Sequence, residues 1–431
     1  MLSLLIGLQA PSAAAGQAPL EPGQVHQRLQ SSTDSTQSYA LYLPTRLAAV
    51  GRLPALLLMD PRGRALVPMG LVRESAERLG YIVISSYNSA SDTDQPVNIP
   101  AVNAMIAELQ GRRILDERRI YLVGFSGTAR DGWLFARQLR GHVAGLIGVG
   151  AGLSAGMRLT PPAAGDSSSF VFFGSAGSTD FNFDEMRGLD QHLDSVGIPH
   201  RVRYFEGPHS WPPAGVMAEA VEWMELQAMR RRLIPPREGW VDSLFRRDVA
   251  VAESLEAAGD GFEAWRRYTA VAADYPGLRD VAAAAEQGER LGRDRRVRQA
   301  AERYREVDRV YARYLTRVRE FLLRVQAGER PPGVKEGLQQ LEVEKLRRQA
   351  ADSSDPIGRG VAIRQLEQAF IAVAFYEPRG YLARGEAAKA LALLELAEAI
   401  RPGRSAVCAA RQEALRRLGR EGEAGALSCG G

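Results

Sequence analysis

Seven apolar segments alternate with helical segments over the first half of the chain, and this alternation constrains the fold more than any other feature. Residues 53–60 ("LPALLLMD") are almost continuously apolar, as expected for a strand buried on both faces. In residues 183–197 ("FDEMRGLDQHLDSVG"), apolar side chains recur at spacings of three and four, which predicts an amphipathic helix. The other predicted strands are residues 37–43, 81–87, 119–125, 143–151, 170–176 and 200–206. Strands that alternate with helices predict an α/β domain, with a mostly parallel sheet flanked by helices, over residues 24–232.

The pattern changes around residues 230–240 ("RRRLIPPREGW"), where Pro235 and Pro236 cannot continue a helix. We therefore predict a linker at residues 233–242, followed by an all-α domain over residues 243–431. Two stretches there, residues 252–277 and 380–424, resemble tetratricopeptide-type helix pairs. A plain helical bundle is the alternative.

Composition excludes several classes of protein. The net charge is +4, with 55 Lys and Arg against 51 Asp and Glu, which is too balanced to indicate a nucleic-acid partner. The sequence contains neither a P-loop nor a zinc-type spacing of Cys and His, so we expect no cofactor and no metal. No segment is apolar over about 18 residues, so no transmembrane span is expected.

Residues near both ends of the chain are relevant to the cellular compartment of the protein. Residues 1–23 begin with a short apolar stretch followed by small residues, which resembles a secretory signal peptide without a basic start. The chain has two cysteines, Cys408 and Cys429, which could pair after export. We predict a periplasmic or secreted protein, with a cytoplasmic location as the alternative if residues 1–23 are not a signal.

The segment "RRIYLVGFSGTARDGW" (residues 118–133) contains a candidate nucleophile, Ser126. A serine on a tight strand-to-helix turn exposes its hydroxyl, and the turn needs small neighbours such as Gly124 and Gly127. The usual G-x-S-x-G pattern has glycine where this chain has Thr128. An ordinary glycine-rich turn is the alternative interpretation.

A base and an acid are required to activate Ser126. Of the five histidines, His209 alone follows a predicted strand at the carboxyl edge of the sheet, in "FEGPHSWPP". Asp180 follows the preceding predicted strand in "GSAGSTDFNFDEM", although an Asp before a helix is also a common cap. Asp184 and Asp190 are the competing acids, and both fall within the predicted helix.

The order Ser126, Asp180, His209 resembles that of α/β-hydrolases. The runs "GFSGTAR" and His-Ser-Trp-Pro resemble those of dienelactone-hydrolase and polyhydroxybutyrate-depolymerase-like esterases, over about the first 230 residues. The resemblance implies an oxyanion hole with the amide of Gly127 and a second donor from the loop "MDPRGRA", where Gly63 and Arg64 are the candidates.

The resemblance implies a serine hydrolase that cleaves carboxylic esters through an acyl-enzyme, acting on a small-molecule or polymeric ester. Tyr87 and Trp211 are candidate substrate contacts, although either side chain could simply pack. Fewer than twenty residues separate the predicted strands at 143–151 and 170–176, which is too short for a large lid. Two alternatives stay open: a serine peptidase, and a non-catalytic scaffold that binds a protein partner through its helical domain.

Overall fold

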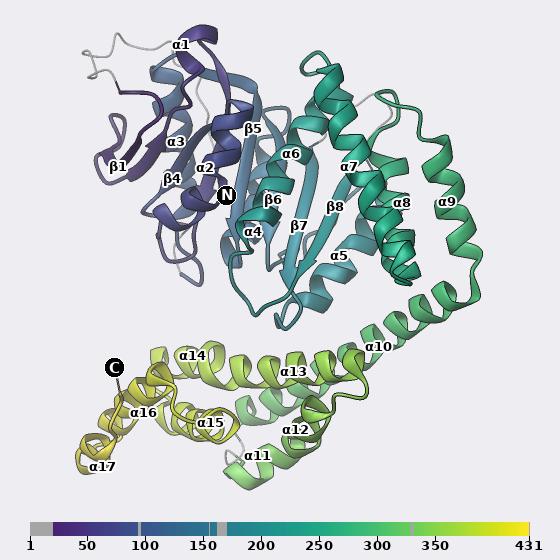
Figure 1. The fold of residues 1–431 in the computed structure, drawn as a ribbon. Helices are drawn as coiled ribbons and strands as arrows, with labels where there is room; N and C mark the ends of the chain where they lie inside the picture. Colours follow the sequence, from purple (N-terminus) through teal and green to yellow (C-terminus); the bar gives the residue numbers. More distant parts are fainter. Residues whose placement is uncertain (1–19, 94–95, 155, 162–169, 329–331, 431) are drawn as a thin grey trace. The chain divides into compact units, whose positions relative to one another are not determined.

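An eight-stranded sheet forms the first half of the chain in the computed structural model, which describes residues 20–93, 96–154, 156–161, 170–328 and 332–430 (Figure 1). The order across the sheet is β1-β2-β4-β3-β5-β6-β7-β8. The strands are β1 (Val25–Gln30), β2 (Ser38–Tyr42), β3 (Leu53–Met59), β4 (Ile82–Ser86), β5 (Leu115–Phe125), β6 (Val143–Val149), β7 (Val171–Gly177) and β8 (His200–Phe205). Strands β3 to β8 are parallel, while β2 pairs antiparallel with both β1 and β4. The predicted α/β class is confirmed.

Helices cover both faces of this sheet (Figure 1). The helices of this half are α1 (Leu47–Val50), α2 (Leu66–Leu79), α3 (Asn98–Gly111), α4 (Gly127–Gln138), α5 (Phe183–Val196) and α6 (Ala214–Arg230). Neighbouring residues of β7, which is buried along its whole length, show why both faces carry apolar side chains: Phe172 packs on Trp133 of α4, and Phe173 packs on Trp223 of α6. Successive side chains of a strand point to opposite faces, so both faces need apolar cover. Strand β1 was not predicted from the sequence, and its side chains are half-buried or exposed.

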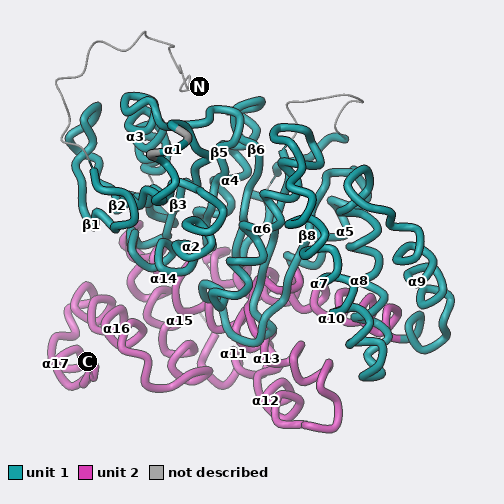
Figure 2. The backbone as a smooth tube through the Cα atoms, turned by 45° about the horizontal axis from the view of Figure 1, so that its top comes forward, with its two compact units in different colours: residues 1–178, 185–299 teal, residues 179–184, 300–431 magenta. Residues whose placement is uncertain are grey.

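The chain divides into two compact units (Figure 2). Unit 1 comprises residues 1–178 and 185–299, and unit 2 comprises residues 179–184 and 300–431. Unit 1 therefore continues through the predicted linker at residues 233–242 and includes α7 (Glu238–Ala257), α8 (Gly261–Asp274) and α9 (Ala282–Arg293). The segment 179–184 is separated from its sequence neighbours and groups with the C-terminal helices.

A buried charge network explains why α7 and α8 belong with the sheet. Arg201 on β8 is 6% exposed and donates to Asp274 of α8 at 2.6 Å and to Asp248 of α7 at 3.1 Å. Asp274 also accepts hydrogen bonds from Trp223 and Gln227 of α6. An arginine buried at this depth requires carboxylate partners, and α7 and α8 supply two of them.

Helices make up unit 2, apart from residues 179–184. They are α10 (Arg295–Gln326, which begins in unit 1), α11 (Val334–Gln340), α12 (Val343–Ala351), α13 (Pro356–Ile371), the π-helical turn η1 (Ala372–Tyr376), α14 (Glu377–Ala383), α15 (Ala387–Ile400), α16 (Ser405–Arg417) and α17 (Glu421–Ala426). Their core includes Phe321, Leu346, Val373, Leu394 and Val407. The second half is all-α as predicted, and its relation to tetratricopeptide repeats stays a prediction.

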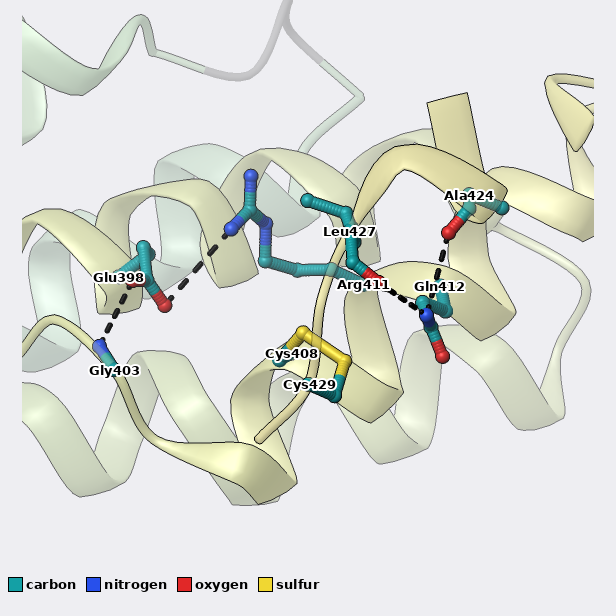
Figure 3. Close-up of a disulfide and its surroundings, with 8 residues drawn as sticks. All are labelled: Glu398, Gly403, Cys408, Arg411, Gln412, Ala424, Leu427 and Cys429. Atoms are coloured by element: carbon teal, nitrogen blue, oxygen red, sulfur yellow. Dashed lines mark hydrogen bonds and ion pairs between the residues drawn. A yellow bond between two sulfur atoms is a disulfide. The ribbon is translucent and has the colours of Figure 1, made fainter. Parts of the chain in front are cut away.

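A disulfide closes the C-terminal end of unit 2 (Figure 3). Cys408 of α16 is bonded to Cys429, which follows α17, with 5.4 Å between their Cα atoms. The side-chain amide of Gln412 donates to the carbonyl oxygens of Ala424 and Leu427, so the last residues are also fastened by hydrogen bonds. The pairing that the sequence left open is therefore present.

Two features are absent from the described residues. No helix within them has the length and apolarity needed to cross a membrane. They also contain no group of His, Cys, Asp and Glu side chains that could hold a metal ion. The predicted signal segment, residues 1–23, lies mostly outside the described residues.

Candidate active site

Ser126 lies at a sharp turn between β5 and α4. Its backbone has φ 56° and ψ −127°, a combination that L-residues adopt rarely and at a cost of about 1–3 kcal/mol. Gly124 permits the turn, because a Cβ on it would lie 2.5 Å from the carbonyl oxygen of Thr128. The amide of Ser126 donates to the carbonyl oxygen of Val149 on β6 at 2.8 Å. This is the strained strand-to-helix geometry that exposes a nucleophile.

The hydrogen bonds of Thr128 explain why this chain departs from the G-x-S-x-G pattern. Its side chain is completely buried, and its hydroxyl accepts the amide of Phe125 at 3.0 Å. The same hydroxyl lies 2.7 Å from the carbonyl oxygen of Met59, at the end of β3, and 2.8 Å from that of Phe125. A threonine here ties the turn to the neighbouring strand, which a glycine could not do.

His209 lies against Ser126, as predicted. Its Nε2 is 2.9 Å from Ser126 Oγ, which is hydrogen-bond distance for a base and a nucleophile. Its ring packs on Phe125, with 4.6 Å between the ring centroids. Ser126 and His209 are each only partly buried, so solvent can reach the pair.

The loop that carries His209 is fastened at its start. Ser178, just after β7, donates its amide to the carbonyl oxygen of Phe205 at 2.8 Å. The hydroxyl of Ser178 donates to Glu206 at 3.0 Å. A Cβ on Gly177 would lie 2.2 Å from the carbonyl oxygen of Gly207, so the end of β7 and the histidine loop touch backbone to backbone. The histidine is therefore held on a supported turn.

Asp60 braces the same loop further along. It is fully buried at the end of β3, and the indole nitrogen of Trp211 donates to its carboxylate at 2.8 Å. The guanidinium of Arg64 makes two further bonds, of 3.0 and 2.8 Å. Burial raises the pKa of Asp60, but hydrogen bonds from Arg64, from Trp211 and from the amides of Arg62 and Arg64 outweigh it, so the net pKa is lowered. Asp60 is therefore a buried anion that joins two loops of the sheet edge.

The roles of Asp60 and Thr128 were not predicted from the sequence. Asp60 is the last residue of an apolar strand run, and a charged residue in that position could have signalled a buried partner. In the sequence Thr128 is only a departure from a motif, and no local signal identifies the carbonyl groups that its hydroxyl contacts. Both depend on segments that are distant in the sequence.

Gly127 and the loop after β3 bear on the predicted oxyanion hole. Gly127 is the first residue of α4, where a helix has no acceptor of its own for the amide and where its dipole favours negative charge. In contrast, the amide of Gly63 donates to the Asp60 carbonyl oxygen at 3.0 Å, and that of Arg64 to the Asp60 carboxylate at 3.3 Å. Gly63 has φ +63°, as a tight turn requires. The second oxyanion donor therefore stays a prediction, since both candidate amides are engaged within the turn.

Tyr87 and Trp211, the predicted substrate contacts, both have structural partners. The hydroxyl of Tyr87 donates to the carbonyl oxygen of Gln27 on β1 at 2.6 Å, and Arg28 lies over its ring. Trp211 bonds to Asp60, as described above. A substrate role for either side chain stays a prediction.

A cavity of ≈ 420 Å³ adjoins the nucleophile turn, with Gly127 in its wall. The polar side chains around it include Asp92, Asn98, Arg130 and Asp131. Arg130 is paired with Glu185, and the amide nitrogen of Asn98 donates to Asp131 at 2.6 Å. Burial raises the pKa of Asp131, while the hydrogen bond from Asn98 opposes this and the charge of Asp92 adds to it. The cavity is thus a recess beside the nucleophile turn whose wall combines polar side chains with apolar ones such as Leu134 and Phe135.

Asp180 is fully buried, two residues after Ser178. Its carboxylate accepts the amide of Asn182 at 2.8 Å, and its carbonyl oxygen accepts the amide of Phe183 at 3.0 Å. The first of these bonds lies within the turn before α5, and both roles of Asp180, orienting acid and helix cap, stay predictions. Asp184, one of the competing acids, is paired with Arg364. Asp190, the other, lies near His200, which opens β8.

Comparisons with known proteins concern the first half of the chain. No family model matches the sequence, and no curated protein matches it. Among solved structures it is similar to FphF, a Staphylococcus aureus fluorophosphonate-binding serine hydrolase solved with substrate bound (14% identity, TM-score 0.40, 47% of this chain and 99% of that chain). It is also similar to a ferulic acid esterase (14% identity, TM-score 0.37, 47% of this chain and 97% of that chain). A third similar structure is the Bacillus cereus carboxylesterase (16% identity, TM-score 0.35, 45% of this chain and 95% of that chain). These likenesses assign no activity to this chain.

Proposed function

We propose that this chain is a serine hydrolase that cleaves carboxylic esters through an acyl-enzyme. The observation that carries the proposal is the 2.9 Å approach of His209 Nε2 to Ser126 Oγ at a strained strand-to-helix turn. A serine hydroxyl is a weak nucleophile until an adjacent base accepts its proton, and this pair meets that requirement. Backbone strain of this kind persists only where the surroundings enforce it.

The steps follow from the residues. His209 accepts the proton of Ser126 as Oγ attacks the ester carbonyl, and the negative charge that forms on the carbonyl oxygen is stabilised by the amide of Gly127. His209 then gives the proton to the departing alcohol, which leaves Ser126 acylated. A water molecule, activated by His209, releases the acid and restores the serine. Asp180 is proposed as the acid that orients His209, because it follows Ser178, whose hydroxyl bonds to the histidine loop.

A small or short-chain acyl ester, or an exposed ester of a polymer, is the proposed substrate. The cavity of ≈ 420 Å³ beside Gly127 supports a compact substituent over a long lipid chain. Its polar side chains favour a substituent with hydrogen-bonding groups.

Labelling with a fluorophosphonate probe tests the proposal, because the probe reacts only with an activated serine. We expect wild type to be labelled and Ser126→Ala and His209→Ala to lose at least about 10³-fold in labelling rate. Ser210→Ala and His142→Ala are matched controls: Ser210 lies on the same loop as His209, and His142 is exposed. Both controls should label as wild type does.

Absence of labelling in folded wild type would refute the hydrolase proposal and favour a non-catalytic scaffold whose helical half binds a protein partner. Labelling that survives in Ser126→Ala would assign the reactive serine elsewhere. Hydrolysis of short p-nitrophenyl esters, compared with hydrolysis of peptide p-nitroanilides, separates an esterase from a peptidase.

Export to the periplasm or beyond is proposed as the compartment. The disulfide between Cys408 and Cys429 supports it, because such bonds persist in oxidising compartments and are rare in the cytosol (Figure 3). Fractionation of the native host, with antibody detection, would test this directly.

A further inference from the structure

The segment 179–184, which carries Asp180, is held by the C-terminal helices. In the sequence it joins β7 to α5, and both of these elements belong to unit 1 apart from the first two residues of α5. The segment itself groups with residues 300–431 in unit 2. The proposed acid therefore lies in a part of the chain whose packing partners come from the helical half.

Tyr311 and Arg364 of unit 2 contact this segment. Tyr311 of α10, 3% exposed, donates its hydroxyl to the carbonyl oxygen of Phe181 at 2.6 Å. Arg364 of α13, 5% exposed, donates from Nε to Oδ2 of Asp184 at 2.7 Å, with a second bond of 3.3 Å to Oδ1. The guanidinium of Arg364 also lies over the ring of Phe183, 4.3 Å from its centroid. Phe181, Phe183 and Asp184 are thus contacted by Tyr311 or Arg364, and all three lie within four positions of Asp180.

The chemistry of these contacts favours orientation over stability. A buried ion pair contributes little net stability, because removing two charges from water costs about as much as their attraction returns. A guanidinium that makes two bonds to one carboxylate, however, fixes distance and angle together. The bond to the Phe181 carbonyl fixes the backbone directly beside Asp180. Such contacts restrict where the Asp180 carboxylate can lie.

We propose that Arg364 and Tyr311 are positioning residues for Asp180, the proposed orienting acid, through their contacts with the segment 179–184. This inference rests on the proposed hydrolase function. It assigns the helical half a role in the reaction itself, in addition to any binding role. Neither residue touches the reacting atoms, and both act through the segment 179–184.

The experiment compares fluorophosphonate labelling rates, and kcat and KM on p-nitrophenyl acetate, for full-length variants. The set is Tyr311→Phe, Arg364→Ala, Arg364→Lys and Asp180→Asn, with Arg364→Ala/Asp180→Asn as the double variant. Arg359→Ala is the matched control, since Arg359 is an exposed arginine on the same helix. Far-UV circular dichroism checks that each variant is folded, and Tyr311→Phe keeps the test informative if Arg364→Ala does not fold.

We expect Arg364→Ala to lower kcat and the labelling rate by about 10- to 100-fold with KM within about twofold, since a small misplacement of a catalytic group costs rate more than binding. Tyr311→Phe should lower kcat several-fold, and Arg364→Lys should recover part of the loss. In the Asp180→Asn background, Arg364→Ala should add less than about twofold, because both changes remove the same contribution.

Two results would overturn the inference while leaving the hydrolase intact: folded Arg364→Ala and Tyr311→Phe that react at the wild-type rate, or a loss in Arg364→Ala that is undiminished in the Asp180→Asn background. Failure of the underlying function gives a different pattern, in which wild type itself is not labelled and every variant matches Ser126→Ala.

Discussion

Replacing Thr128 by valine tests whether the hydroxyl at the last position of the nucleophile motif holds the turn. Valine keeps the shape of threonine and removes only the polar group. The amide of Phe125, 3.0 Å from the hydroxyl, then loses its partner in a completely buried site, and the carbonyl of Met59 loses a donor at 2.7 Å. Each buried group left unpaired costs about 1–3 kcal/mol, so we expect a loss of about 2–4 kcal/mol in the free energy of unfolding.

Two companion variants sharpen this prediction. Thr128→Ser keeps the hydroxyl and loses a buried methyl group, which should cost about 1 kcal/mol. Thr128→Gly restores the usual motif but loses the hydroxyl and adds backbone entropy, so it should cost at least as much as valine. The order of stability expected is therefore Thr, Ser, Val, Gly.

Urea unfolding followed by tryptophan fluorescence is the appropriate assay. All five tryptophans lie between residues 133 and 265, within unit 1, so the signal reports on the unit that contains the turn. The fluorophosphonate labelling rate should fall in the same order, because Ser126 lies between Phe125 and Thr128, which the hydroxyl links by a hydrogen bond. A valine variant within about 0.5 kcal/mol of wild type, or a glycine variant more stable than wild type, would refute this reasoning.

Three further predictions concern buried charges in unit 1. Asp60→Asn should destabilise unit 1 by about 1–3 kcal/mol in urea unfolding, because an amide cannot accept all the hydrogen bonds that the carboxylate does. The pKa of Asp60 is lowered on folding. The stability that the wild-type carboxylate contributes is therefore present above pH 3.8 and is lost as the pH falls through the folded pKa. Arg201→Met should cost about 3–5 kcal/mol, because it leaves the buried carboxylate of Asp274 without its cation; a neutral effect in urea would contradict the proposed network. Burial lowers the pKa of His200, but the hydrogen bond to Asp190 and neighbouring charges outweigh this effect, so the net pKa is raised. The stability that the charged His200 ring contributes is therefore complete below pH 6.5 and is lost as the pH rises through the folded pKa. A His200→Gln variant should therefore lack this pH dependence in melting temperature, and an unchanged profile would show that the ring is not the source.

The fold class could be predicted from the sequence because strands buried on both faces leave a strong local signal. Residues 53–60 and 143–151 are apolar without alternation, and a parallel sheet explains this directly. The same logic predicted that Ser126 and His209 lie near one another, since both follow strands whose carboxyl ends share an edge. The observed distance of 2.9 Å between their side-chain atoms agrees with that expectation.

The extent of each unit could not be predicted in the same way. Pro235 and Pro236 do interrupt the helices, yet unit 1 continues past them because Arg201 on β8 is neutralised by carboxylates on α7 and α8. Those partners are 47 and 73 residues away in the sequence, and no periodicity records such a pairing. The grouping of residues 179–184 with the C-terminal helices is of the same kind, because it depends on Tyr311 and Arg364.

Three supports of the Ser126–His209 pair come from the carboxyl edge of the sheet. Thr128 ties the turn after β5 to β3, Asp60 at the end of β3 binds the indole of Trp211, and Ser178 after β7 binds the histidine loop. These contacts lie within unit 1, whereas the contacts that hold the segment of Asp180 lie within unit 2. On the proposed mechanism, changes in the helical half should therefore reduce the contribution of Asp180, the proposed acid, and leave Ser126 and His209 in place. A hydrolase in that state keeps a residual rate from its remaining groups, about 10³–10⁴ above the uncatalysed reaction in serine proteases, so Arg364 variants should be slow and not inert.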